Sequence, residues 1–335
     1  MFQTDLHIWL QEFDSEWIIQ IFKTITALGY VEFFMVSLIV VITGIHFRKG
    51  FILLLIVMWT AAVTLVMKDV FDLPRPYMVE NEVVILDGEV DTDMALLDDA
   101  DATHFFELLP QSTVEYFDNQ PIPYGFPSGH TSIAVVFWGT LMLLFRKRWL
   151  SVLCVSLIVL IPFSRIYLGV HFIADVLGGY FIGGIMLWVF YRLVIRPEAM
   201  IQYLKVNIHH FSFDIKNFLI LVAPFIWLAL LNDVKYWIVP AVLFGFGLGF
   251  MILSQKGLPN ETGSTLNRIV KVMSALGIFA ASNFLIQQIF ISVGLEDVAI
   301  AEFIRYSLVS FITIWFGTLL HLKFGWVERV KSIEQ

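Results

Sequence analysis

Three short polar stretches of this chain each lie beside a long apolar run, at 68–76 ("KDVFDLPRP"), 127–130 ("PSGH") and 164–175 ("SRIYLGVHFIAD"). Together they contain three cations, two imidazoles, a carboxylate and a Ser-Gly pair. These residues are Lys68, Arg75, Ser128, Gly129, His130, Arg165, His171 and Asp175. Side chains of these types, brought to one place, could hold an anion and attack it.

The cations of these stretches favour a phosphate ligand. Lys68, Arg75 and Arg165 offer three positive charges, and the two guanidinium groups are planar donors that match phosphate oxygens. Ser128 and the Gly129 amide stand where a helix is expected to begin, and a helix N-terminus favours anions. The pattern predicts a phosphate pocket.

The two histidines are expected to have different roles. His171 and Asp175 are four residues apart, so on a helix they share a face, and the carboxylate can fix the imidazole tautomer and leave the other ring nitrogen as a nucleophile. His130 has no such partner in its motif and suits a general acid and base. A zinc site on His130, His171 and Asp175 is the chemical alternative. Three cations beside a dication make zinc unfavourable, so no metal site is predicted.

The elements that carry these stretches must lie in a membrane. Of the 335 residues, 58% are hydrophobic and 15% are charged, whereas soluble domains have about 25% charged residues. Runs suited to crossing ~30 Å of hydrocarbon as helices predict an all-α integral membrane protein with about nine transmembrane helices, five in a core and four C-terminal. They lie at 25–46, 51–67, 131–145, 149–163, 173–195, 218–231, 237–254, 272–293 and 302–321.

Lysine and arginine predict the orientation, because they are retained on the cytoplasmic side. With the turn at 46–50 inside, alternation of nine spans places fifteen of the 21 Lys and Arg residues inside. The N-terminus is then outside, the C-terminus is cytoplasmic, and the three polar stretches all lie at the outer face, toward the periplasm, exterior or lumen of a cell or inner membrane.

Three regions are predicted along the chain. Residues 1–24 have apolar side chains at helical spacing and are expected to form an amphipathic interfacial helix. Residues 25–196 contain the core with its acidic outer loop, 77–126, and 197–335 form a C-terminal four-span block. The loop has twelve acidic residues and neither Lys nor Arg, so it is expected to be a solvated cover, with a substrate-selecting lid as the alternative. Its stretch 91–101 lacks the glycine and the final Glu of an EF-hand calcium loop.

These motifs together resemble a known family. The spacing K-x6-R-P, then P-S-G-H, then S-R-x5-H-x3-D is similar to the three-part signature of the type 2 phosphatidic acid phosphatase (PAP2) superfamily, over residues 68–175. The resemblance implies a metal-independent phosphatase without cofactors, in which His171 forms a phosphohistidine, Asp175 orients it and His130 is acid and then base. Lys68, Arg75, Ser128, Gly129 and Arg165 would hold the phosphoryl oxygens.

The expected function is hydrolysis of a lipid phosphate at the outer or luminal face. Phosphatidic acid, phosphatidylglycerophosphate, an isoprenyl diphosphate and a sphingoid base phosphate all fit a pocket beside the bilayer. The nine-span plan more weakly resembles the sphingosine-phosphate phosphatase and glucose-6-phosphatase branches. A soluble sugar phosphate is therefore one alternative, and a non-catalytic transporter or scaffold is another. No nucleic-acid partner is expected, and nothing in the sequence indicates an oligomeric state.

Overall fold

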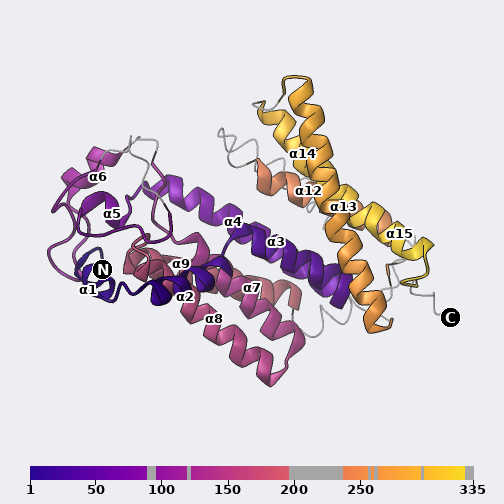
Figure 1. The fold of residues 1–335 in the computed structure, drawn as a ribbon, viewed down its shortest axis with the longest axis horizontal. Coiled ribbons are helices and arrows are strands. Elements are labelled where there is room, and N and C mark those ends of the chain that lie inside the picture. The colour runs from indigo at the N-terminus through magenta and orange to yellow at the C-terminus, as the bar shows by residue number, and fades with distance from the viewer. Residues whose placement is uncertain are drawn as a thin grey trace. The chain divides into compact units, whose positions relative to one another are not determined.

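The computed structural model describes residues 1–88, 96–118, 122–195, 237–255, 258–259, 263–295 and 298–328. Within these ranges every regular element is a helix, as the composition predicts (Figure 1). The elements are α1 Asp5–Gln11, α2 Glu16–Ala27, α3 Val31–Ile39, η1 Val40–Ile45, α4 Phe47–Phe71, α5 Pro76–Val79, α6 Gln111–Phe117, α7 Gly129–Phe145, α8 Arg148–Tyr167, α9 Ile173–Phe190, η2 Tyr191–Ile195, α12 Ile238–Gln255, α13 Thr265–Ser292, α14 Ala299–Phe311, η4 Ile312–Phe316 and α15 Gly317–Lys323.

The long apolar helices show that this is an integral membrane protein. Among the described residues five helices are long and apolar enough to cross a membrane, and the bent pair Glu16–Ala27 and Val31–Ile45 makes a sixth if it is one span. Gly129–Phe145 and Ile238–Ser254 are shorter apolar helices. Each predicted span that falls on described residues coincides with one of these segments. The span predicted at 218–231 lies outside them, so the number nine stays a prediction.

The chain divides into two compact units. The first comprises Met1–Phe34 and Trp59–Ile195, and the second comprises Met35–Met58 with the chain beyond residue 195. A segment of the predicted core, Met35–Met58, groups with the second unit, and the predicted domain boundaries stay predictions. All three polar stretches belong to the first unit. Residues 197–217, at the start of the predicted C-terminal block, lie outside the described residues.

Helix α7 is the centre of the first unit, where it packs against α8 and α9. The approach of α9 depends on small residues. A Cβ added to Gly179 would lie 2.6 Å from Thr131 Cβ and 2.7 Å from the Ser128 carbonyl oxygen, which is closer than packed side chains tolerate. Gly169, with a φ of +77°, makes the turn between α8 and α9 in a backbone conformation that favours glycine. These glycines bring the second and third polar stretches together.

The N-terminal residues form two helices where one was predicted. The chain leaves the helical conformation between Gln11 and Glu16, which separates α1 from α2. Trp9 and Trp17 are exposed, at 53% and 66%, while Phe2 is buried. Helices α1 and α2 pack against α8, so this segment is amphipathic and covers the first unit. Its place at a membrane interface stays a prediction.

The described parts of the acidic loop are folded more tightly than the predicted solvated cover. Met78, Val79 and Phe117 are completely buried, in one apolar cluster with Phe2 and Phe172. The mixture of acidic and apolar residues in the loop accounts for the difference, because its apolar side chains can pack inward while exposed carboxylates such as Glu107 and Glu115 stay in water. Residues 91–95 of the stretch considered for calcium lie outside the described residues.

Candidate active site

The third polar stretch places His171 against Asp175. His171 Nδ1 lies 3.1 Å from Asp175 Oδ2, and the two side chains are 3% and 0% exposed. The same oxygen accepts a hydrogen bond from the Phe172 amide at 3.0 Å, which fixes the carboxylate at the first turn of α9. Because a carboxylate accepts, His171 Nδ1 carries the proton and Nε2 keeps its lone pair. This is the arrangement that the i, i+4 spacing predicts.

The second polar stretch begins α7. Ser128 is the N-cap, and its hydroxyl accepts from the Thr131 amide at 3.4 Å. The Ser128 amide donates to the Asp175 carbonyl at 2.9 Å, which ties the start of α7 to α9. Gly129 is the first residue of α7, and Nε2 of His130, the second, is buried without a hydrogen-bond partner. A buried imidazole nitrogen without a partner is costly in a finished core, so it is free for a ligand.

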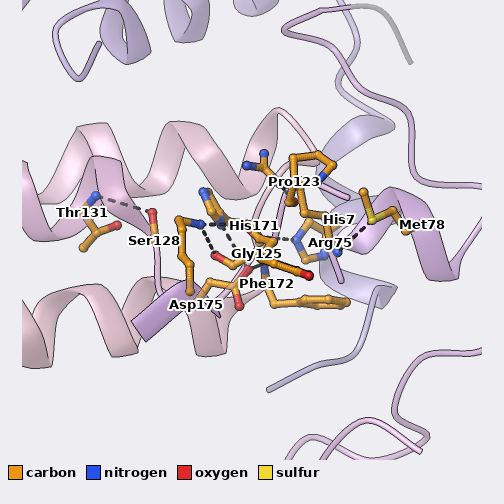
Figure 2. Close-up of polar contacts among 12 residues, drawn as sticks. His7, Arg75, Met78, Pro123, Gly125, Ser128, Thr131, His171, Phe172 and Asp175 are labelled. Atoms are coloured by element: carbon orange, nitrogen blue, oxygen red, sulfur yellow. Dashed lines mark hydrogen bonds and ion pairs between the residues drawn. The ribbon is translucent and has the colours of Figure 1, made fainter. Parts of the chain in front are cut away.

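The first polar stretch contacts the segment just before "PSGH". Lys68 Nζ donates to the Gly125 carbonyl at 3.2 Å, and Arg75 Nε donates to the Pro123 carbonyl at 2.7 Å. A Cβ on Gly125 would lie 2.9 Å from Asp175 Oδ2 and 2.8 Å from the Pro74 carbonyl oxygen. Residues 123–125 therefore join the two cations to the His171-Asp175 pair, and Figure 2 shows Arg75, Gly125, Ser128, His171 and Asp175 in one cluster.

Arg165 is held by residues that lie outside all three stretches. Its Nη1 donates to Thr26 Oγ1 and to Asp87 Oδ2, both at 2.7 Å. The Tyr30 hydroxyl donates to the same Asp87 oxygen. The Tyr30 ring lies edge-on to the His130 ring, with centroids 5.0 Å apart. Arg165 and His130 are thus brought together by residues that motif reasoning did not select.

His7 supports the backbone of His171. Its Nε2 lies 2.9 Å from the His171 carbonyl oxygen, and since a carbonyl only accepts, this nitrogen is the donor. The ring also contacts Phe172 edge-on at 6.0 Å between centroids. Figure 2 shows His7 beside His171 and Phe172. No sequence spacing indicates this role for His7, because the two residues are 164 positions apart.

Electrostatics keep His171 neutral. Burial lowers its pKa well below the usual value, and the positive charges of Arg75, Lys68 and Arg165 lower it further. The contact with Asp175 is therefore a hydrogen bond from a neutral imidazole rather than a full ion pair. A neutral imidazole with a free Nε2 is the form that can act as a nucleophile.

All eight residues that the sequence selected lie in the first unit. The contacts above form two groups, one around Asp175 with Lys68, Arg75, Ser128 and His171, and one in which Asp87 and Tyr30 link Arg165 to His130. Gly129 is placed by its position at the start of α7. Within the described residues no group of three or more His, Cys, Asp and Glu side chains is arranged to hold a metal ion. The residues selected from the sequence thus lie around the ends of α4, α7, α8 and α9. The roles of the eight residues stay predictions.

Comparison with known proteins agrees with this site. Residues 49–198 match the sequence model of the PAP2 superfamily. This part of the chain contains the entire three-part motif and is similar to that superfamily. Thr26, Tyr30 and His7 lie outside the matched residues.

Curated relatives carry phosphatase names. The chain is 38% identical over 79 residues to a lipid A 4'-phosphatase of Bacteroides thetaiotaomicron, covering 24% of this chain and 35% of that protein. It is 38% identical over 64 residues to an undecaprenyl-diphosphatase of Sulfolobus acidocaldarius, covering 19% and 31%. A lipid A 4'-phosphatase of Porphyromonas gingivalis is 35% identical over 76 residues, covering 23% and 32%. The matches thus span about a third of each relative's length. No solved structure matches the chain.

Proposed function

We propose that this protein is a membrane phosphatase that removes phosphate from a lipid phosphate at the outer or luminal face, through a phosphohistidine on His171. One observation carries the proposal. The neutral imidazole of His171 has its Nδ1 fixed by a buried carboxylate 3.1 Å away. The cations Lys68 and Arg75 and the N-capped start of α7 lie beside this pair. That combination suits nucleophilic attack on a phosphate monoester or diphosphate.

The proposed reaction has two steps. His171 Nε2 attacks phosphorus, the bond from phosphorus to the leaving oxygen breaks, and His130 gives that oxygen a proton. Water then attacks the phosphohistidine, His130 takes a proton from it, and the phosphorus-nitrogen bond breaks to release inorganic phosphate. Lys68, Arg75 and Arg165 would neutralise the charge on the equatorial oxygens, with the Ser128 hydroxyl and the Gly129 amide as donors at the helix start.

The substrate class follows from the place of the site and from the relatives' names. The proposed site residues lie at the ends of apolar helices, where a headgroup could be bound while its tail stays in the bilayer. Relatives named for lipid A and for undecaprenyl diphosphate support a lipid phosphate over a soluble sugar phosphate. Phosphatidic acid, phosphatidylglycerophosphate and a sphingoid base phosphate belong to the same chemical class.

The decisive experiment is phosphate release by purified protein in detergent or vesicles, with EDTA present throughout. The panel contains a lipid A phosphate, undecaprenyl diphosphate, the three other lipid phosphates and glucose 6-phosphate. We expect turnover of a lipid phosphate in EDTA. Turnover that requires added metal would contradict the metal-independent mechanism, and preference for the sugar phosphate would contradict the lipid assignment.

The predicted orientation has its own test. Ser112 lies exposed on α6 in the acidic loop, and Lys147 lies exposed between α7 and α8. In intact cells Ser112→Cys is expected to react with an impermeant thiol reagent, and Lys147→Cys is expected to react only after lysis. The native Cys154 is buried and adds little background. The reverse labelling pattern would invert the topology.

A further inference from the structure

We propose that Thr26, Tyr30 and Asp87 are positioning residues that aim Arg165 at the phosphate and fix the His130 ring. The inference rests on the proposed function, because it assigns supporting residues to the same site. Two of the three precede the residues that match the PAP2 superfamily, and Asp87 lies in the acidic loop outside the three motifs.

The contacts of Arg165 divide its guanidinium into an occupied side and a free side. Nη1 donates to Thr26 Oγ1 and Asp87 Oδ2, both at 2.7 Å, while Nε is buried and has no hydrogen-bond partner. Arg165 is only 5% exposed, so water does not readily provide a hydrogen-bond partner for Nε. In a guanidinium, Nε lies on the edge shared with Nη2, away from Nη1, and that edge is the fork that binds phosphate oxygens. Thr26 and Asp87 hold one nitrogen and leave the fork available.

Tyr30 connects this arrangement to His130. Its hydroxyl donates to Asp87 Oδ2, its ring centroid lies 5.8 Å from Arg165 Cζ, and its ring meets His130 edge-on at 81°. The preceding residue supports the same ring, because a Cβ on Gly29 would lie 2.7 Å from His130 Cδ2. The turn between α2 and α3 therefore fixes the imidazole, and one carboxylate joins that turn to Arg165.

A competing interpretation makes Asp87 a gate, a carboxylate that occupies the arginine until phosphate displaces it. The geometry favours positioning, because Asp87 contacts Nη1 and does not contact the Nε edge. The two interpretations predict opposite changes in phosphate affinity when Asp87 is replaced. Removal of a gate tightens phosphate binding, whereas loss of a positioning carboxylate weakens it.

The test measures inorganic phosphate binding by calorimetry and lipid phosphate turnover on the same purified proteins. Asp87→Asn removes the negative charge that Arg165 and Tyr30 both contact, and Tyr30→Phe and Thr26→Val each remove one hydroxyl contact, all with little change of shape. We expect about tenfold weaker phosphate binding and a similar rise in KM for Asp87→Asn, with smaller effects of the same sign for the other two. Glu115→Gln, an exposed change in the same loop, serves as the matched control and is expected to leave both unchanged.

Coupling distinguishes positioning from simple destabilisation. In an Arg165→Lys background, Asp87→Asn is expected to change phosphate binding less than twofold further, because its effect acts through the guanidinium fork. Fully additive effects, unchanged binding in Asp87→Asn, or tighter binding would each overturn the inference. If the wild type binds phosphate but hydrolyses no substrate, the proposed function fails while the binding data still decide the inference. If the wild type binds no phosphate, both fail.

Discussion

The two units of this protein bury polar groups in different ways. In the second unit, most buried polar residues in the described part are serines and threonines, and several bond within their own helix, as Ser254 does to the Met251 carbonyl at 2.7 Å and Thr313 to Val309 at 2.7 Å. In the first unit the buried groups include Arg165, His171 and Asp175, and Arg165 Nη1 donates to residues 78 and 139 positions away.

The difference indicates that the first unit buries charged groups at a cost in folding free energy, and that these groups are the ones expected to act in the reaction. A hydroxyl that bonds its own helix needs no other element to be in place. A buried charge is costly unless a partner is delivered by the tertiary fold. Substitutions in the first unit are therefore expected to affect activity, while those in the second affect stability.

The largest effect is expected for the nucleophile. His171→Ala removes Nε2 and should lower turnover on the order of 10^4-fold. The measurements are phosphate release and acid-quench trapping of labelled phosphoenzyme, with His104→Ala, an exposed loop histidine, as the control. Covalent labelling that persists in His171→Ala would assign the nucleophile elsewhere.

The next effect is expected at the segment that joins the cations to the carboxylate. Gly125→Ala would place a methyl group 2.9 Å from Asp175 Oδ2, so either the carboxylate or the segment must shift. We expect kcat/KM to fall by about 10- to 100-fold. Gly184→Ala on α9, where a Cβ meets nothing within 4 Å, should retain activity. Equal activity of the two variants would refute the close approach.

His7 should connect stability and activity. His7→Ala leaves the buried His171 carbonyl without its donor, at a cost of about 1 to 3 kcal/mol. A several-fold loss of kcat is expected, with partial rescue in His7→Gln. The measurements are thermal unfolding in detergent and turnover. Unchanged turnover in a stable His7→Ala protein would show that His7 does not support the active site.

His7 is also expected to make the stability of the protein depend on pH. Burial lowers the pKa of His7 in the folded protein, while in the unfolded chain it titrates near about 6.5. The unfolded state then binds more protons below that pH, so stability is present above it and falls as the pH drops. His7→Gln should show a smaller loss of Tm between pH 7 and 5. Some loss remains, because burial also lowers the pKa of His171.

The smallest effect on activity is expected in the second unit. A Cβ on Gly245 would lie 2.2 Å from the Ser307 carbonyl oxygen, so Gly245→Ala should destabilise the protein by about 1 to 3 kcal/mol. Turnover per folded molecule should stay within about twofold of the wild type. Gly277→Ala, in open space on α13, controls for the loss of a glycine. A large loss of kcat would show that the second unit contributes to the reaction.

The sequence predicts much of this molecule because the relevant physics is local. Apolar runs predict the helices, and the four-residue spacing of His171 and Asp175 predicts their contact on α9. Ser128 at the start of α7 is likewise readable as an N-cap. The predictions that failed concern longer range, since the continuous N-terminal helix is broken between α1 and α2 and the described parts of the acidic loop are packed.

What only the tertiary structure decided is which groups complete the site. Thr26, Tyr30, Asp87 and His7 have ordinary residue types with no informative spacing, and their partners lie 57 to 164 positions away. A hydroxyl, a carboxylate or an imidazole can bond many partners, so its residue type does not specify which one. The packing of α1, α2 and the acidic loop on α8 and α9 makes that selection, because it alone determines which polar groups leave water together.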